Sequence, residues 1–61
     1  MDDEQLLKVE EVARRFAVSA REIWRGVADG TFPKPIKLGP KTTRWLESEI
    51  LSHLQKLKEA R

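Results

Sequence analysis

Hydrophobic residues recur at helical spacing near the start of the chain. They fall at positions i, i+3, i+4 and i+7: Val9, Val12, Ala13 and Phe16. This spacing predicts a helix over residues 9–16 with one face toward a core. Lys8 stands at the N-cap position, where Ser, Thr or Asp is usual, so the helix is expected to begin with a weak cap. Residues 5–8 are expected to form a short strand or arm. Acid-to-base pairs are expected on the outer face of the helix: Glu10 with Arg14, and Glu11 with Arg15.

A second helix is marked by its caps. Ser19 and Glu22 form an S-x-x-E capping box, so the helix begins after Ser19. Gly30 is placed to end it, since glycine adopts the left-handed conformation common at helix C-termini. Only two residues separate this helix, residues 20–29, from the first. Two short helices joined by so tight a turn are typical of a helix-turn-helix.

The segment after Gly30 cannot be helical, because it contains three prolines. Phe32, Ile36 and Leu38 share one parity, which predicts a strand with a largely apolar face and with Lys37 on the other. Two prolines in this run favour an edge strand. Gly39-Pro40-Lys41 is typical of a turn, and residues 42–46 are expected to return as a second strand. The resulting hairpin is basic at Lys37, Lys41 and Arg44.

A last helix is expected from Glu47 or Ser48 to the C-terminus. Its apolar stripe consists of four residues: Ile50, Leu51, Leu54 and Leu57. The predicted fold is therefore mostly α with a small β-hairpin, a winged helix-turn-helix made of strand or arm, helix, helix, hairpin wing and helix. Sixty-one residues are expected to form a single domain, residues 1–61, with residues 1–4 disordered.

The net charge of +2 conceals a strong asymmetry along the chain. Residues 12–45 carry eight basic and two acidic side chains, whereas residues 1–11 carry one basic and five acidic ones. A concentrated basic segment is typical of nucleic-acid binding, although a solvated charged surface explains it equally well. There is no cysteine, one histidine and no apolar run near the length of about 20 residues that a membrane span needs. We therefore expect no catalytic site, no metal site, no cofactor and no membrane contact.

Four stretches of the chain resemble the AlpA-like prophage regulators, which are small relatives of the excisionases and of the MerR-type winged helix domains. The stretches are L-L-K-V-E-E-V-A, V-S-x-x-x-I-W-R, G-T-F-P-K-P-I-K-L-G and R-W-L-E-S-E-I. The similarity extends over about residues 5–57. It implies a protein of phage or prophage type that binds double-stranded DNA and acts in transcription regulation, or as a recombination directionality factor (excisionase).

In this family the second helix enters the major groove and the hairpin wing lies along the backbone or the minor groove. By position, the resemblance assigns the helix contacts to Ser19, Ala20, Arg21, Trp24 and Arg25. It assigns the wing contacts to Lys37, Lys41, Thr42 and Arg44. It also implies a bacterial cytoplasmic protein, associated with the nucleoid when bound, with a phage integrase and self-association on DNA as candidate partners.

The individual residues suggest a division of roles. Arg21 is the first candidate for reading a base edge, because a guanidinium matches the O6 and N7 atoms of guanine; a phosphate contact or a solvated charge is the alternative. Arg25 fits a phosphate contact. Trp24 either packs on the DNA backbone or is partly buried against the wing. His53 is expected to be at the surface or partly buried. Three aromatic residues are expected in the core: Phe16, Phe32 and Trp45.

Some positions depart from the family pattern. Ala17 stands where the turn often has glycine, and it is strained if that position needs a positive φ. Gly26 replaces a larger residue inside the second helix, at a cost of up to about 1 kcal/mol. Ala20 replaces a longer polar side chain, so the target sequence cannot be carried over from the family. A different kind of function is also open, because Leu51 widens the apolar face of the last helix and would suit a protein–protein interaction module.

Overall fold

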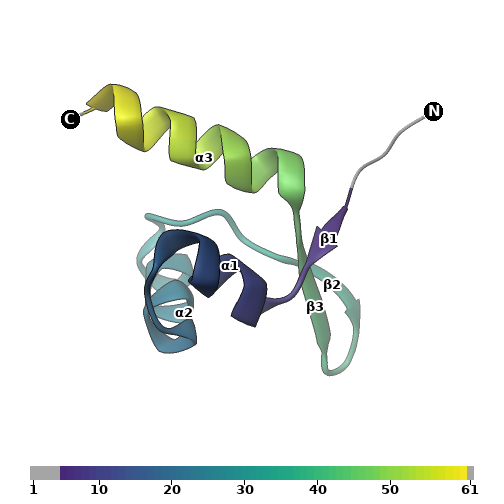
Figure 1. Cartoon of the computed structure of the whole chain (residues 1–61). Coiled ribbons are helices and arrows are strands. Elements are labelled where there is room, and N and C mark those ends of the chain that lie inside the picture. The colour runs from purple at the N-terminus through teal and green to yellow at the C-terminus, as the bar shows by residue number, and fades with distance from the viewer. Residues whose placement is uncertain (1–4, 61) are drawn as a thin grey trace.

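The computed structural model describes residues 5–60 and contains three helices and three strands. In chain order these are β1 (Leu6–Leu7), α1 (Val9–Phe16), α2 (Ala20–Asp29), β2 (Ile36–Gly39), β3 (Thr42–Leu46) and α3 (Glu47–Ala60) (Figure 1). The mostly α architecture with a small β-hairpin confirms the predicted winged helix-turn-helix. Residues 1–4, which were expected to be disordered, lie outside the described residues.

Helix α1 has residues at both ends that are uncommon at those positions: Lys8 at the N-cap and Ala17 at the C-cap. The Lys8 side chain has no hydrogen-bond acceptor, but the Lys8 N–H donates to Glu11 Oε1 at 2.9 Å, which supplies half of a capping box. At the other end Ala17 has φ 57° and ψ 40°, and its N–H donates to the Arg14 carbonyl at 3.1 Å. The turn between the two helices therefore requires a left-handed residue, and the strain expected for Ala17 is confirmed.

Neither of the two acid-to-base pairs expected on the outer face of α1, Glu10 with Arg14 and Glu11 with Arg15, is an ion pair in residues 5–60. Glu11 caps its own helix, and Arg15 forms an ion pair with Glu47 at 3.1 Å. Arg15 and Glu47 belong to elements far apart in sequence, so this pair ties α1 to the start of α3. Sequence spacing alone proposed Glu11 as the partner of Arg15, because it could not include a residue brought in by the fold.

Helix α2 has both predicted caps. The Glu22 N–H donates to Ser19 Oγ at 3.3 Å, and the Ser19 N–H donates to Glu22 Oε1 at 3.0 Å. Gly30 ends the helix with φ 82°. The chain folds back after α2, and the Gly26 carbonyl accepts bonds from the Thr31 and Phe32 N–H groups at 2.9 and 3.1 Å. A Cβ at Gly26 would lie 3.0 Å from Phe32 Cβ, so glycine here serves a close approach.

The three strands form an antiparallel sheet in the order β1-β3-β2. Strand β1 pairs with β3 through Leu6 opposite Leu46 and Leu7 opposite Trp45. Strand β2 pairs with the other side of β3, but it begins only at Ile36. The strand expected to include Phe32 is therefore shorter than predicted. Proline lacks the N–H group that a sheet ladder needs, which agrees with the loop at residues 31–35.

The core lies between the helices and the sheet. Its buried residues come from five of the six elements: Leu7, Val12, Ala13, Ile23, Trp45 and Ile50. Phe16 and Phe32 pack around this core, as expected, with ring centroids 5.3 Å apart. Of the stripe predicted on α3 only Ile50 is fully buried, whereas Leu51 and Leu57 are about half exposed. Helix α3 extends past the core, so its apolar side chains after Ile50 are not fully buried.

Candidate nucleic-acid interface

The exposed face of α2 carries the predicted helix contacts. Arg21, Trp24 and Arg25 stand at i, i+3 and i+4, which places them on one side of the helix. Ile23 points into the core from the opposite side. Arg21 and Arg25 are exposed, as is Ser19, while Ala20 is half-buried. The capping box at Ser19 and Glu22 stabilises the first turn of α2, from which Arg21 projects, with Arg25 one turn further on.

Trp24 is partly buried against the wing and partly exposed. Its ring centroid lies 5.2 Å from that of Trp45, at an interplanar angle of 52°. The side chain nevertheless remains 40% exposed. One part of the indole is thus packed against the buried tryptophan of the wing, and the other part faces solvent between α2 and the hairpin. An aromatic ring held in this way can contact a partner with little loss of side-chain entropy.

The wing residues are divided between the two faces of the hairpin. Ile36 pairs with Arg44 and Lys37 with Thr43, and paired residues of an antiparallel ladder share a face. Thr43 in turn shares its face with Trp45, which is fully buried against the helices. Lys37 therefore lies on the helix side of the wing, while Arg44 and the exposed Ile36 lie on its outer side. Sequence parity separated Lys37 from Ile36 correctly, but it could not show which face would be buried.

The remaining predicted contacts lie near the tip of the hairpin. Pro40 and Lys41 form the turn, and Lys41 is exposed. Thr42 and Arg44 are half-buried. Arg44 Nη1 donates to the Thr43 carbonyl at 2.7 Å, which directs its guanidinium along the strand. The tip therefore offers one free ammonium group and, behind it, one guanidinium held against the backbone.

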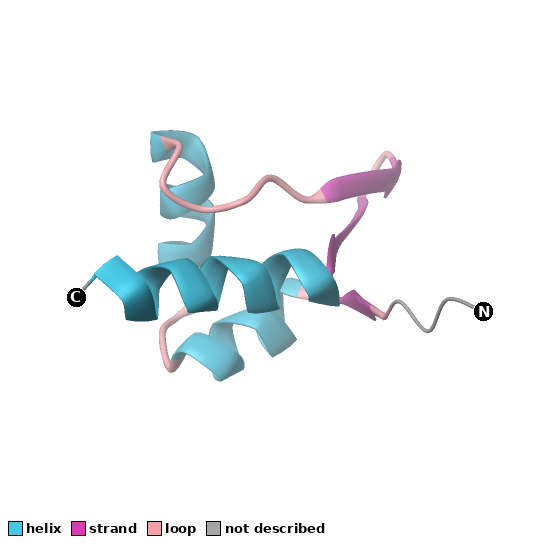
Figure 2. Ribbon diagram, turned by 90° about the horizontal axis from the view of Figure 1, so that it is seen from above, coloured by secondary structure: helices cyan, strands magenta, loops and turns pink. Residues whose placement is uncertain are grey.

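Helix α2 and the tip of the hairpin lie on the same side of the molecule, opposite α3. Figure 1 shows α2 and the tip of the hairpin below the body of the protein and α3 across its upper side. In the view from above, α3 is nearest the viewer and α2 lies behind it (Figure 2). The two elements that carry the predicted contact residues thus both lie on the side away from α3, although the loop at residues 31–35 separates them in sequence.

Helix α2 and the hairpin carry more basic than acidic side chains. The basic residues are Arg21, Arg25, Lys37, Lys41 and Arg44. In the part of the chain that the structure describes, the ion pair is that of Arg15 with Glu47, and none of these five residues is paired with a carboxylate. A set of unpaired cations on an α-helix and an adjacent hairpin suits a polyanion with a groove that admits a helix.

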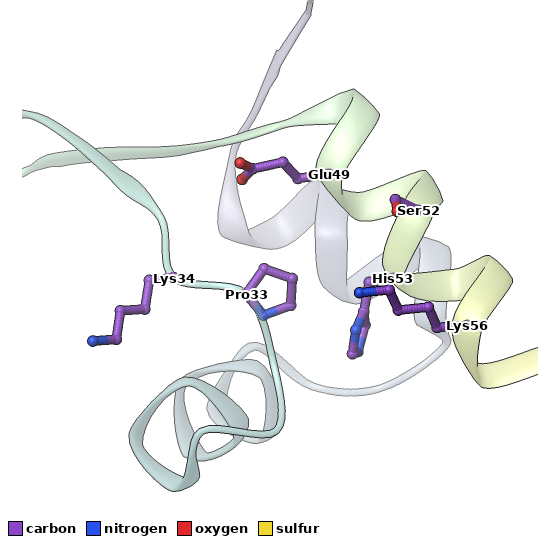
Figure 3. Close-up of a pocket in the computed structure, with 6 residues that line it drawn as sticks. All are labelled: Pro33, Lys34, Glu49, Ser52, His53 and Lys56. Atoms are coloured by element: carbon purple, nitrogen blue, oxygen red, sulfur yellow. The ribbon is translucent and has the colours of Figure 1, made fainter. Parts of the chain in front are cut away.

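A recess lies between the loop before β2 and α3 (Figure 3). It has a volume of about 510 Å³ and is lined by Pro33, Lys34, Glu49, Ser52, His53 and Lys56. His53 stacks edge-on against Phe32, with centroids 4.9 Å apart. Burial, with a smaller contribution from the Lys56 charge, lowers the pKa of His53 below 6.5. Its aromatic neighbours were not foreseen, because they come from α1 and the loop.

The described residues contain no group of three or more His, Cys, Asp or Glu side chains that could hold a metal ion. Between residues 5 and 60 there is also no helix with the length and apolar character needed to cross a membrane. Among known families, the model of the prophage CP4-57 regulatory protein (AlpA) matches residues 5–57. No curated protein and no solved structure shows a significant match.

Proposed function

Since the chain belongs to the AlpA family of prophage regulatory proteins, we propose that it binds double-stranded DNA sequence-specifically, with α2 in the major groove and the wing on the backbone or minor groove. It then acts as a transcription regulator or as a recombination directionality factor in the bacterial cytoplasm, without catalysis and without a cofactor. The observation that supports this proposal is that α2 and the hairpin, which both lie opposite α3, carry basic residues outside the ion pair that the described residues form.

The roles of the helix residues follow from their positions. Arg21 lies in the first turn of α2, beside the Ser19 cap, and its planar guanidinium suits a base edge, most readily guanine. Arg25 lies one turn further on and suits a phosphate. The exposed part of Trp24 packs against the sugar-phosphate backbone next to it. Ala20 leaves room for the backbone of α2 to approach the groove closely.

The roles of the wing residues follow from the two faces of the hairpin. Lys37, on the helix side, neutralises a phosphate on the strand that α2 also contacts. Lys41 at the tip and Arg44 on the outer side contact phosphates further along the DNA, and Thr42 adds a hydroxyl group there. These contacts set the register of the protein on the duplex, while sequence is read through α2.

The first experiment measures affinity for a random duplex over a series of salt concentrations. With the four charged phosphate contacts proposed above, the slope of log K against log salt is expected near −3.6, because each contact contributes about −0.9. Lys41→Ala should make the slope about one unit shallower. Lys58→Ala is the matched control, because Lys58 is an exposed lysine on α3, away from the proposed interface. A flat salt response of the unaltered protein would refute DNA binding.

The second experiment tests the division between the two arginines. Arg25→Ala should weaken binding to every sequence alike, whereas Arg21→Ala should also relax the preference at one base pair, by about 1–3 kcal/mol of discrimination. Selection of binding sites from a random duplex pool by each variant gives the comparison. Identical preferences of the two variants would show that Arg21 does not read a base.

A second candidate function rests on α3. Leu51 and Leu57 are half exposed on the helix that lies away from α2 and the wing. This surface suits a protein partner, such as an integrase or another copy of the chain on DNA. A module that acted only through this surface would bind DNA without salt dependence or not at all, so the salt series separates the two functions.

A further inference from the structure

The wing exposes apolar side chains among its charges. Leu38 is 55% exposed, the largest exposed fraction among the large apolar side chains of the described residues, and Ile36 is 37% exposed. Both lie on β2, where Lys37 separates them and the Lys41 turn follows. A single exposed apolar side chain needs no explanation, but two of them on one four-residue strand of a basic hairpin do.

The register of the hairpin accounts for the position of Leu38. Lys37 pairs with Thr43 and Gly39 pairs with Thr42, so Leu38 is the additional residue of a bulge. A bulge bends its strand and turns a side chain away from the regular ladder. Here the redirected side chain is a leucine, and it is turned into solvent next to the tip of the wing. Packing in the core does not use it.

From this arrangement we propose that Leu38, supported by Ile36, is an apolar wedge that enters the minor groove when the wing lies on DNA. The proposal rests on the DNA-binding function proposed above and names a contact that phosphate binding alone does not supply. Proteins that bind the minor groove often insert Leu, Ile or Pro side chains against the sugars and base edges, and partly unstack one step. Lys37 and Lys41 flank Leu38 and bind phosphates at the rims of the groove.

Charge favours DNA over a second copy of the chain as the occupant of this surface. Two wings brought together through β2 would place the Lys37 and Lys41 side chains of one copy near those of the other, which is unfavourable. The walls of the minor groove are lined by phosphates, so the same lysines are complementary there. Strand β2 is also short and bulged, which disfavours pairing along its free edge.

An apolar contact has a distinct thermodynamic signature. It displaces water from carbon atoms but neutralises no phosphate, so it strengthens binding without changing the salt slope. It also deforms the duplex, which a contact to phosphates on an undistorted backbone does not require. The wedge can therefore be separated experimentally from the charged contacts of the same wing.

The test compares Leu38→Ser with Leu6→Ser on a short duplex that carries a fluorophore at each end. Leu6 is a matched control, because it is 45% exposed but lies on β1, on the side of β3 away from β2. Leu38→Ser should bind about five- to tenfold more weakly than the unaltered protein, the loss expected for a partly buried leucine. Its salt slope should be unchanged and its DNA bend smaller. Leu38→Met should restore both properties, and Leu6→Ser should change neither.

Each outcome decides between the alternatives, once thermal unfolding has established that the variants are folded. Equal affinity and equal bend for Leu38→Ser and Leu6→Ser would overturn the wedge while leaving DNA binding intact. If the unaltered protein shows no salt-dependent binding, the proposed function itself fails, and the wedge with it. If Leu38→Ser binds the short duplex normally but sediments differently at high concentration, the surface joins two copies of the chain and the wedge is refuted.

Discussion

Replacing Ala17 with glycine is expected to stabilise the protein. Ala17 ends α1 in the left-handed region, with φ 57° and ψ 40°, and its side chain is exposed. The substitution therefore removes a steric conflict between Cβ and the backbone without removing a packed side chain. Both the bond from the residue 17 N–H to the Arg14 carbonyl and the fold of the turn can remain as they are.

The magnitude is the difference between two effects. An alanine in the left-handed region costs about 1–2 kcal/mol relative to its usual conformation. Glycine has more freedom in the unfolded chain, which subtracts about 0.4–1 kcal/mol. The free energy of unfolding should therefore rise by about 0.5–1 kcal/mol, and Tm by about 3–6 °C for a domain of this size.

The assay is reversible thermal unfolding followed by circular dichroism, with Ala28→Gly as the matched control. Ala28 is also an exposed alanine, but it lies within α2, where glycine lowers stability by up to about 1 kcal/mol. The two identical substitutions should thus shift Tm in opposite directions. A lower Tm for Ala17→Gly, or shifts of the same sign for both variants, would refute the reasoning from backbone conformation.

Three further predictions concern the core and its surroundings. Gly26→Ala should lower Tm despite the better helix propensity of alanine, because its Cβ would lie 3.0 Å from Phe32 Cβ; a higher Tm would mean that the loop yields. Trp45→Phe should lower the free energy of unfolding in urea by about 1–3 kcal/mol, since the Pro33 carbonyl loses its 2.8 Å bond from Nε1; an unchanged midpoint would exclude that. Burial lowers the pKa of His53, so its contribution to stability is complete above pH 6.5 and is lost as the pH falls through the lower pKa of the folded protein. His53→Gln should remove this decline from Tm measured against pH, and an identical profile for the variant would contradict the assignment.

Local signals in the sequence predicted the helix-turn-helix well. The Ser19 cap depends on Glu22 three residues away, and Gly30 ends α2 through its own backbone conformation. Such features involve only neighbouring residues, so they can be recognised without the fold. The strain at Ala17 was foreseen from the family pattern, and the structure gives the φ angle that explains it.

The wing was less predictable, because its properties depend on pairing between strands. Parity placed Ile36 and Leu38 on one apolar face, but a pattern of period two does not indicate which face the rest of the molecule covers. That choice is made by Trp45, which turns the face of Lys37 toward the helices. The bulge at Leu38 is a mismatch between two strands, and neither strand reveals it alone. For the same reason, the contacts of His53 with Phe16 and Phe32 required the fold.

The spacing between α2 and the wing depends on Trp45, a buried residue that is not among the residues predicted to contact DNA. Trp45 is fully buried on β3, packs against Trp24 of α2 and Phe32 of the loop, and donates to the Pro33 carbonyl. Trp45 therefore contacts both α2 and the loop at residues 31–35 that joins α2 to the hairpin. A change that shrinks its side chain should let the wing shift relative to α2 and should weaken every proposed DNA contact that requires both at once. The loss of DNA affinity would exceed the loss caused by replacing any single exposed lysine. One lysine affects only its own phosphate contact, whereas the spacing of helix and wing affects all the proposed contacts together.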